Sequence, residues 1–162
     1  MGVMAMFEQQ LGRSVTIDQA AELYHRLVML VAPSGAGKTA ALQDVHERTM
    51  APLVNVNLEL SRRMLDLTER QRALQLPHLL SEIVRASAAE VILLDNIEVL
   101  FDVSLKQDPL RLLQGLSRNR TVVAAWNGSI ESERLVYATP DHPEYRRFPV
   151  RDVLVVNPGA IA

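Results

Sequence analysis

The chain has no cysteine and few aromatic residues, and its histidines are scattered. Among 162 residues cysteine is absent and aromatic residues make up 4%. Disulfide bonds, cysteine-based zinc sites and thiol catalysis are therefore excluded. The four histidines, at positions 25, 46, 78 and 142, lack the spacing of metal ligands. The simplest interpretation of each is a helix or loop residue.

Neither the charge nor the apolar runs favour a nucleic acid or a membrane as partner. The formal net charge is −2, which argues against a generally basic nucleic-acid binder. No apolar run reaches the roughly 18 residues that cross a bilayer, and Met1–Phe7 lacks the basic start of a signal peptide. We therefore expect a cytoplasmic protein without membrane contact. A composition of 48% hydrophobic and 22% charged residues is typical of one soluble globular domain.

A short apolar run followed by a glycine-containing loop lies near the start of the chain. Leu27–Ala32 has the pattern of a buried strand, and Pro-Ser-Gly-Ala-Gly-Lys-Thr follows it. This is the Walker A or P-loop pattern, with Ala32 where the commonest form has its first glycine. Gly35 and Gly37 let the backbone bring N–H groups up to phosphate oxygens. The helix expected from Lys38 points the positive end of its dipole at the same anion.

The loop predicts a bound nucleoside triphosphate with Mg²⁺. Lys38 would contact the β- and γ-phosphates, and the Thr39 hydroxyl would complete the Mg²⁺ shell. A chance glycine turn after a buried strand is the alternative, but the expected strand before the loop and helix after it favour the P-loop. The predicted nucleotide-binding residues are Pro33, Ser34, Gly35, Ala36, Gly37, Lys38, Thr39 and Ala40.

A second buried strand ends in a carboxylate. Val91–Asp95 consists of four apolar residues and an aspartate, which is the Walker B pattern. The strand would deliver Asp95 to the carboxyl edge of the sheet, where open α/β sheets bind ligands. There Asp95 would hold Mg²⁺ together with Thr39, directly or through water. An acidic residue after a strand is common, so the prediction depends on the pairing with Lys38 and Thr39.

The residue after Asp95 argues against efficient hydrolysis. Many ATPases carry a glutamate there that polarises the attacking water, whereas this chain has Asn96, which cannot act as a base. Glu98 takes that role if the loop bends back, and is otherwise a solvated helix residue. Loss of a general base costs roughly 10²–10⁴ in rate. Slow or partner-stimulated hydrolysis is therefore as consistent with the sequence as none.

Asn127 and two arginines complete the predicted catalytic residues. Asn127 follows the apolar stretch at 121–126, and it would sense the γ-phosphate if that strand lies between the Walker A and Walker B strands. Otherwise it only forms an Asn-Gly turn. Arg146 and Arg147 precede the last apolar stretch, where either would reach a neighbouring subunit of a homo-oligomer. An arginine supplied in this way is worth roughly 10³–10⁵ in rate.

A second arginine pair lies just before the stretch at 121–126. Arg118 and Arg120 could contact nucleic-acid phosphates, but two arginines on an acidic domain support this only weakly. Solvated surface residues are the simpler interpretation of any of the four arginines.

Apolar stretches alternate with helical patterns along the chain, which is typical of a parallel sheet covered on both faces. The strands are expected at 27–32, 53–60, 91–95, 121–126 and 153–156. Helices are expected at 38–50, at 64–84 with an interruption at Pro77, and from Pro109 behind the capping residue Asp108. Residues 129–149 contain three prolines and are expected to be mostly loop.

These elements predict an α/β fold of the P-loop NTPase type. It would be a three-layer sandwich around a five-stranded parallel sheet, formed by a single domain over residues 16–162 with a helix starting near Asp18. Residues 1–15 give only a weak helix signal, interrupted by Gly12, and are expected to be loosely structured.

The motifs resemble those of additional-strand P-loop ATPases, the branch that contains AAA-type enzymes. Ala-Pro-Ser-Gly-Ala-Gly-Lys-Thr, Leu-Leu-Asp-Asn, the strand-end Asn127 and Tyr-Arg-Arg-Phe occur in the same order in this layout. The resemblance implies that ATP is the nucleotide. It extends to the AAA-like core only, because the helical lid that normally follows is not expected here.

A closer resemblance is to the BrxF family of small P-loop proteins from type 3 BREX bacteriophage-defence systems. It rests on the size, the near-minimal core and the stretches at 94–98, 108–120 and 126–128. It implies a bacterial defence component that works beside other BREX proteins, including a larger ATPase, a methyltransferase and a phosphatase-like protein.

Three functions remain open from the sequence. The first is an ATPase that cycles during defence. The second is a nucleotide-dependent assembly module that does not hydrolyse ATP and recruits partners in its bound state. The third, with least support, is a small-molecule kinase in which 129–149 closes as a lid, although no acceptor-site signature is present.

Overall fold

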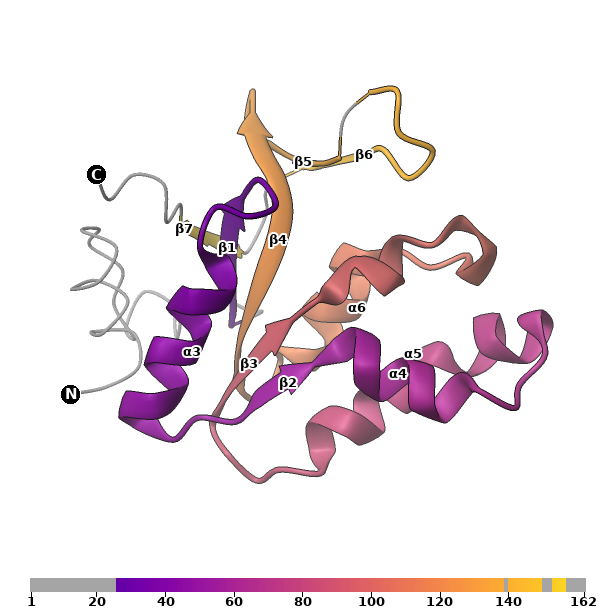
Figure 1. The fold of residues 1–162 in the computed structure, drawn as a ribbon, viewed down its shortest axis with the longest axis horizontal. Helices are drawn as coiled ribbons and strands as arrows, with labels where there is room; N and C mark the ends of the chain where they lie inside the picture. Colours follow the sequence, from indigo (N-terminus) through magenta and orange to yellow (C-terminus); the bar gives the residue numbers. More distant parts are fainter. Residues whose placement is uncertain (1–25, 139, 150–152, 157–162) are drawn as a thin grey trace.

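Five parallel strands form the centre of the molecule in a computed structural model that describes residues 26–138, 140–149 and 153–156. Their order across the sheet is β2-β3-β4-β1-β7 (Figure 1). The bounds are β1 Leu27–Ala32, β2 Leu53–Asn55, β3 Val91–Asp95, β4 Thr121–Glu131 and β7 Val153–Val156. The predicted α/β class with a mostly parallel sheet is confirmed. The predictions for residues 1–15 and for a helix near Asp18 lie outside the described residues.

Helices cover both faces of this sheet. Helix α3 (Lys38–Thr49) packs on one face. The other face is covered by α4 (Val56–Met64), α5 (Glu69–Arg85), α6 (Pro109–Leu116) and the 3₁₀ helices η1 (Ile97–Phe101) and η2 (Val103–Leu105). Every residue of β1 is buried, with Val28 and Leu30 on the α3 side and Leu27 and Met29 on the other. Burial on both faces explains why β1 is a continuous apolar run.

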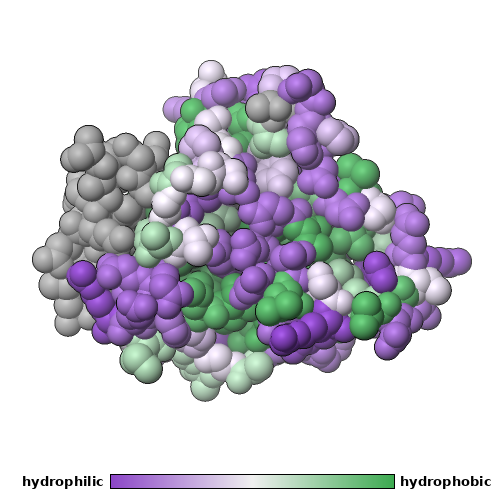
Figure 2. Space-filling model, viewed as in Figure 1, coloured by the Kyte–Doolittle hydropathy of each residue, from purple (hydrophilic) through white to green (hydrophobic). Residues whose placement is uncertain are grey.

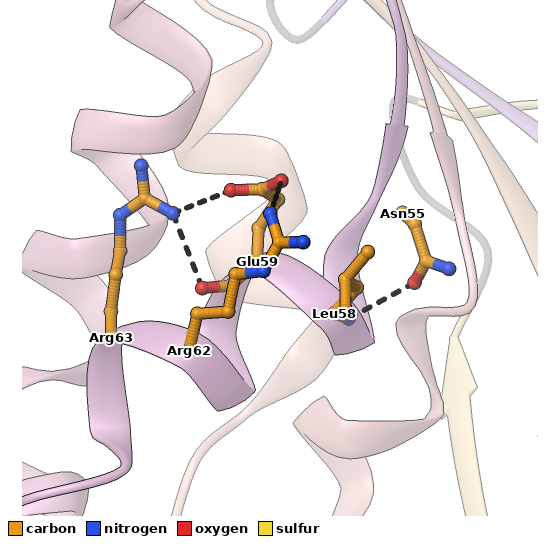
Figure 3. A network of polar contacts seen from close by, with 5 residues as sticks. All are labelled: Asn55, Leu58, Glu59, Arg62 and Arg63. Atoms are coloured by element: carbon orange, nitrogen blue, oxygen red, sulfur yellow. Dashed lines mark hydrogen bonds and ion pairs between the residues drawn. The ribbon is translucent and has the colours of Figure 1, made fainter.

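The second strand is shorter than predicted. It ends at Asn55, and the expected strand residues 56–60 belong to α4 instead. Figure 3 shows the reason: the Asn55 side chain accepts a hydrogen bond from the backbone N–H of Leu58 at 3.0 Å and caps the helix. Farther along the helix, Glu59 pairs with Arg63 at 2.7 Å. The apolar residues 56, 60 and 64 also have helical spacing, so the capped helix formed in place of the strand.

Helix α5 is not interrupted at Pro77, contrary to the prediction. It runs without a break over 17 residues and starts with a capping box between Thr68 and Gln71. Pro77 has no N–H and so leaves the carbonyl of Ala73 without its helical partner. The side-chain amide of Gln107 donates to that carbonyl at 2.7 Å. This outside donor satisfies the carbonyl that the proline leaves free.

Residues 129–149 are not mostly loop. The strand at 121–126 continues to Glu131, and β5 (Arg134–Tyr137) and β6 (Arg146–Pro149) pair antiparallel beyond it. The last four residues of β4, together with β5 and β6, are called the antiparallel extension below; it projects past the parallel sheet (Figure 1). Its tight turn has positive φ at Ser132 (50°) and Glu133 (61°). Such turns favour Asn-Gly or Asp-Gly, so Ser-Glu gave no hairpin signal.

Several large apolar side chains of the described residues are exposed. Figure 2 shows hydrophilic and hydrophobic residues interspersed on the face viewed. The large apolar side chains that are exposed belong to Met50, Leu58, Leu65, Leu74, Val103 and Ile130. None of the described helices is both long enough and apolar enough to cross a membrane.

Candidate functional site

The loop between β1 and α3 depends on two glycines for its backbone shape. Gly35 has φ of 79° and Gly37 has φ of 92°, a region that side chains disfavour. A Cβ placed on either glycine would meet nothing within 4 Å, so the conformation and not crowding requires glycine. The N–H of Ala36 donates to the carbonyl of Pro33 at 3.2 Å and closes a turn. Residues 33–37 of this loop are all exposed.

The N-terminus of α3 opens into this loop. Gly37 is the N-cap, and no described side chain caps the helix there. The first helical hydrogen bond runs from the N–H of Ala41 to the carbonyl of Gly37 at 3.0 Å. The N–H groups of Lys38, Thr39 and Ala40 therefore have no partner within the helix. Together with the helix dipole, such N–H groups attract an anion.

Lys38 is the buried cation of the site. Its side chain is only 6% exposed, and Nζ donates to the carbonyls of Ala32 at 2.8 Å and Pro33 at 2.7 Å. Burial lowers the pKa of Lys38, while the carboxylates of Glu98 and then Asp95 act to raise it.

Asp95 ends β3 at the carboxyl edge of the sheet and is 7% exposed. Its carboxylate accepts the N–H of Asn96 at 2.9 Å. Asn96 adopts a left-handed conformation with φ of 54°, which asparagine tolerates better than most residues. The chain turns sharply here and enters η1, the 3₁₀ helix that carries Glu98.

Glu98 and Asn127 meet although they lie 29 residues apart in the sequence. The amide Nδ2 of Asn127 donates to Oε1 of Glu98, so Glu98 is bonded and half-buried and is not a freely solvated residue. Strand β4 lies between β1 and β3 and pairs Asn127 with Ala32, which is the strand order that the sensor prediction required. The simple Asn-Gly turn is wrong, because β4 continues through Gly128. The roles of both residues in catalysis stay predictions.

Two of the four arginines, Arg120 and Arg146, donate to backbone carbonyls. Arg146 on β6 donates to the backbone carbonyl of Gln107 at 2.7 Å, whereas Arg147 is exposed. Arg120 donates to the carbonyls of Val84 and Ser87 at 3.1 and 2.9 Å and so holds the end of α5. A role for Arg146 or Arg147 in a neighbouring subunit stays a prediction.

Tyr137 is a neighbour of the site that sequence reasoning missed. It lies on β5 and is 5% exposed, and its ring stacks on Phe101 of η1. Burial raises the pKa of Tyr137 well above its usual range, and the charges of Glu98 and Glu144 raise it further. The hydroxyl is therefore protonated at every physiological pH. The local sequence did not predict the β4–β5 hairpin, which brings Tyr137 next to Phe101.

A small cavity also adjoins the loop. It has a volume of about 300 Å³ between the loop and the antiparallel extension. Its lining is formed by Pro33, Ser34, Asn127, Gly128, Ser129 and Ala138. The loop and the end of β4 therefore face one shared space.

A metal ion would need ligands from outside the protein at this site. In the described part of the chain no three His, Asp or Glu side chains gather into a metal-binding group. Thr39 and Asp95 nevertheless suit Mg²⁺, because this ion commonly uses one or two protein oxygens together with phosphate oxygens and waters. The arrangement thus matches a metal that arrives with a phosphorylated ligand.

No protein-family model matches this chain, and a search of curated proteins finds no match either. The function of this chain is therefore inferred from the loop residues 33–39 and from the side chains at the carboxyl edge of the sheet.

Proposed function

We propose that the chain binds ATP with Mg²⁺ and hydrolyses it slowly or on stimulation by a partner. One observation carries the proposal: a buried lysine donates to two loop carbonyls beside the open N-terminus of α3, and the charges of Glu98 and Asp95 act on it. A buried cation in this position has partners of opposite charge and an exposed anion-binding loop next to it.

Each residue has a separate task in this proposal. Lys38 and the N–H groups at the start of α3 hold the phosphates, and Thr39 and Asp95 hold Mg²⁺, which neutralises phosphate charge when bound. Glu98 accepts a proton from the attacking water, and Asn127 orients Glu98 through the hydrogen bond between them. The arginine predicted to act from a neighbouring subunit would be Arg147, because Arg146 is engaged by Gln107.

The two lysines of the chain offer a matched test. Binding of a fluorescent ATP analogue should weaken by at least about 100-fold in Lys38→Ala, as expected for loss of a charge-assisted contact to phosphate. Lys106→Ala should bind like the parent, because Lys106 is exposed at the end of η2. Phosphate release, measured with malachite green, should follow the same order. Equal binding of the ATP analogue by Lys38→Ala and Lys106→Ala would refute the proposal.

The alternative is an assembly module that binds ATP without cleaving it. It is favoured by the Asn127–Glu98 hydrogen bond, which occupies the one carboxylate available as a base, and by Asn96 next to Asp95. ATP and a non-hydrolysable analogue should then shift the oligomeric state equally in light scattering. Rapid turnover by the isolated protein would contradict this alternative.

We further propose that this activity serves bacterial phage defence, on the resemblance to the BrxF family. The other BREX proteins are then its partners, and a direct contact with nucleic acid has only weak support. In a host that carries a type 3 BREX system, Lys38→Ala in this component should abolish plaque reduction while Lys106→Ala preserves it. Full protection against phage by both variants would show that defence does not depend on nucleotide binding by this chain.

A further inference from the structure

We propose that the antiparallel extension sets the position of Glu98, with Tyr137 as the positioning residue. This inference rests on the proposed function, because it concerns the carboxylate assigned there as the base. It adds a positioning role for a part of the chain that the nucleotide motifs do not include.

The first link joins Glu98 to the extension through η1. Glu98 and Phe101 belong to the same short 3₁₀ helix, one turn apart. The ring of Phe101 is fully buried and stacks on Tyr137, with ring centroids 3.5 Å apart and an interplanar angle of 5°. Trp126 packs edge-on against Phe101 at 5.1 Å. A displacement of Tyr137 must therefore move Phe101 and the helix turn that carries Glu98.

The second link joins the extension to Asn127. Tyr137 pairs with Gly128, the residue that follows Asn127 in β4. The indole N–H of Trp126 donates to the carbonyl of Val136 at 3.1 Å, so β5 is fastened on both sides of Asn127. Because Asn127 donates to Glu98, the extension reaches this carboxylate by two independent routes.

The extension is itself anchored at its outer strand. Phe148 of β6 packs edge-on against Phe101 and Trp126, at 6.4 and 5.6 Å between centroids. Arg146 of the same strand is held by the carbonyl of Gln107. The aromatic cluster thus packs β5, β6 and η1 against one another.

Electrostatics supports this contact geometry. The charge of Glu98 acts on the Tyr137 hydroxyl strongly enough to raise the pKa of that hydroxyl, after the larger effect of burial. The two groups are therefore near enough for their charges to interact, which agrees with the route from Tyr137 through the ring of Phe101 to the turn that carries Glu98.

The test compares Tyr137→Leu, which removes the ring, with Tyr137→Phe, which keeps the stack. Tyr145→Leu is the matched control, since Tyr145 is half-buried and takes no part in the aromatic cluster. In Tyr137→Leu the turnover number should fall about 10- to 100-fold while ATP affinity stays within about twofold, because a displaced base affects only the chemical step. Tyr137→Phe should lose less, and Tyr145→Leu should match the parent.

Two further measurements separate positioning from general damage. Adding Tyr137→Leu to Glu98→Gln should cause little further loss, since a residue that acts only through Glu98 has no effect once this carboxylate is gone. Hydrogen exchange of residues 97–101 should be faster in Tyr137→Leu than in Tyr145→Leu, and this readout needs no turnover. If even the parent lacks turnover but the exchange changes, the coupling stands and the proposed hydrolysis falls. Unchanged exchange, or rate losses that multiply with those of Glu98→Gln, would overturn the inference. If Tyr137→Leu does not fold, Tyr137→Met, which also removes the ring, is tested by the same readouts.

Discussion

Among the glycines that the structure describes, Gly128 is the one whose replacement by alanine should destabilise the fold most. A Cβ at this position would lie 1.8 Å from the carbonyl oxygen of Val136, 2.9 Å from its carbonyl carbon and 3.1 Å from Nε1 of Trp126. Two of these atoms are backbone and the third belongs to a fully buried ring, so none can move aside cheaply. Strands β4 and β5 must separate at this rung.

The loss in free energy of unfolding caused by Gly128→Ala has two parts. Overpacking of a well-packed core costs about 1–3 kcal/mol. Separation of the strands also breaks the Trp126–Val136 hydrogen bond, which leaves buried polar groups unsatisfied at about 1–3 kcal/mol. Together they give about 2–6 kcal/mol, a large share of the roughly 5–15 kcal/mol by which a domain of this kind is stable. In urea this corresponds to a midpoint lower by about 1–3 M.

The chain contains its own probe and its own control. Trp126 is the only tryptophan and is buried beside Gly128, so its fluorescence follows unfolding at this point. Gly115→Ala is the control, because a Cβ there meets nothing within 4 Å. Gly115 lies in α6, and alanine should stabilise that helix by up to about 1 kcal/mol. Equal urea midpoints for the two variants would refute the close approach of β5 to β4 as described.

Three other predictions concern the backbone and the lysine. Met50 caps α3 with φ of 64°, so Met50→Gly should stabilise the protein by about 1 kcal/mol in urea unfolding, whereas Met50→Ala should bring no such gain. Ser132→Asn combined with Glu133→Gly suits the positive φ at both turn positions and should raise the melting temperature by a few degrees in circular dichroism; a lower one would contradict the turn geometry. Burial lowers the pKa of Lys38, whereas bound phosphates would raise it. ATP affinity should therefore be highest at pH values below the lowered pKa of the free protein. As the pH rises, the affinity should begin to decline before the pH reaches the ordinary lysine pKa of 10.5. Calorimetry over a pH series checks this, and an affinity that stays constant up to 10.5 would contradict it.

The sequence predicted the elements that have local patterns. Strands β1, β3 and β7 are continuous apolar runs, and they lie where they were expected. Helix α6 begins behind the cap at Asp108, whose side chain accepts the N–H of Arg111 at 3.1 Å. The predictions failed where two local patterns competed, as at Asn55, or where a distant group compensated a local defect, as Gln107 does for Pro77.

The antiparallel extension shows a different limit. Its turn is formed by Ser-Glu, which has none of the usual hairpin signal, and three prolines nearby favoured a loop. The strands form because Leu135, Tyr137 and Phe148 bury their side chains against Phe101 and Trp126. That burial cannot be read locally, since the partners come from η1 and from the centre of β4.

The amino-acid sequence by itself determined the loop at 33–39, the lysine within it and the carboxylate at the end of β3. These depend on residue types at fixed short spacing: glycine for positive φ, and an apolar strand that must end at a sheet edge. Tertiary structure alone decided that Asn127 lies beside Ala32 and donates to Glu98, and that Tyr137 stacks on Phe101. Strand pairing and aromatic packing set these contacts, and both act between residues far apart in the chain.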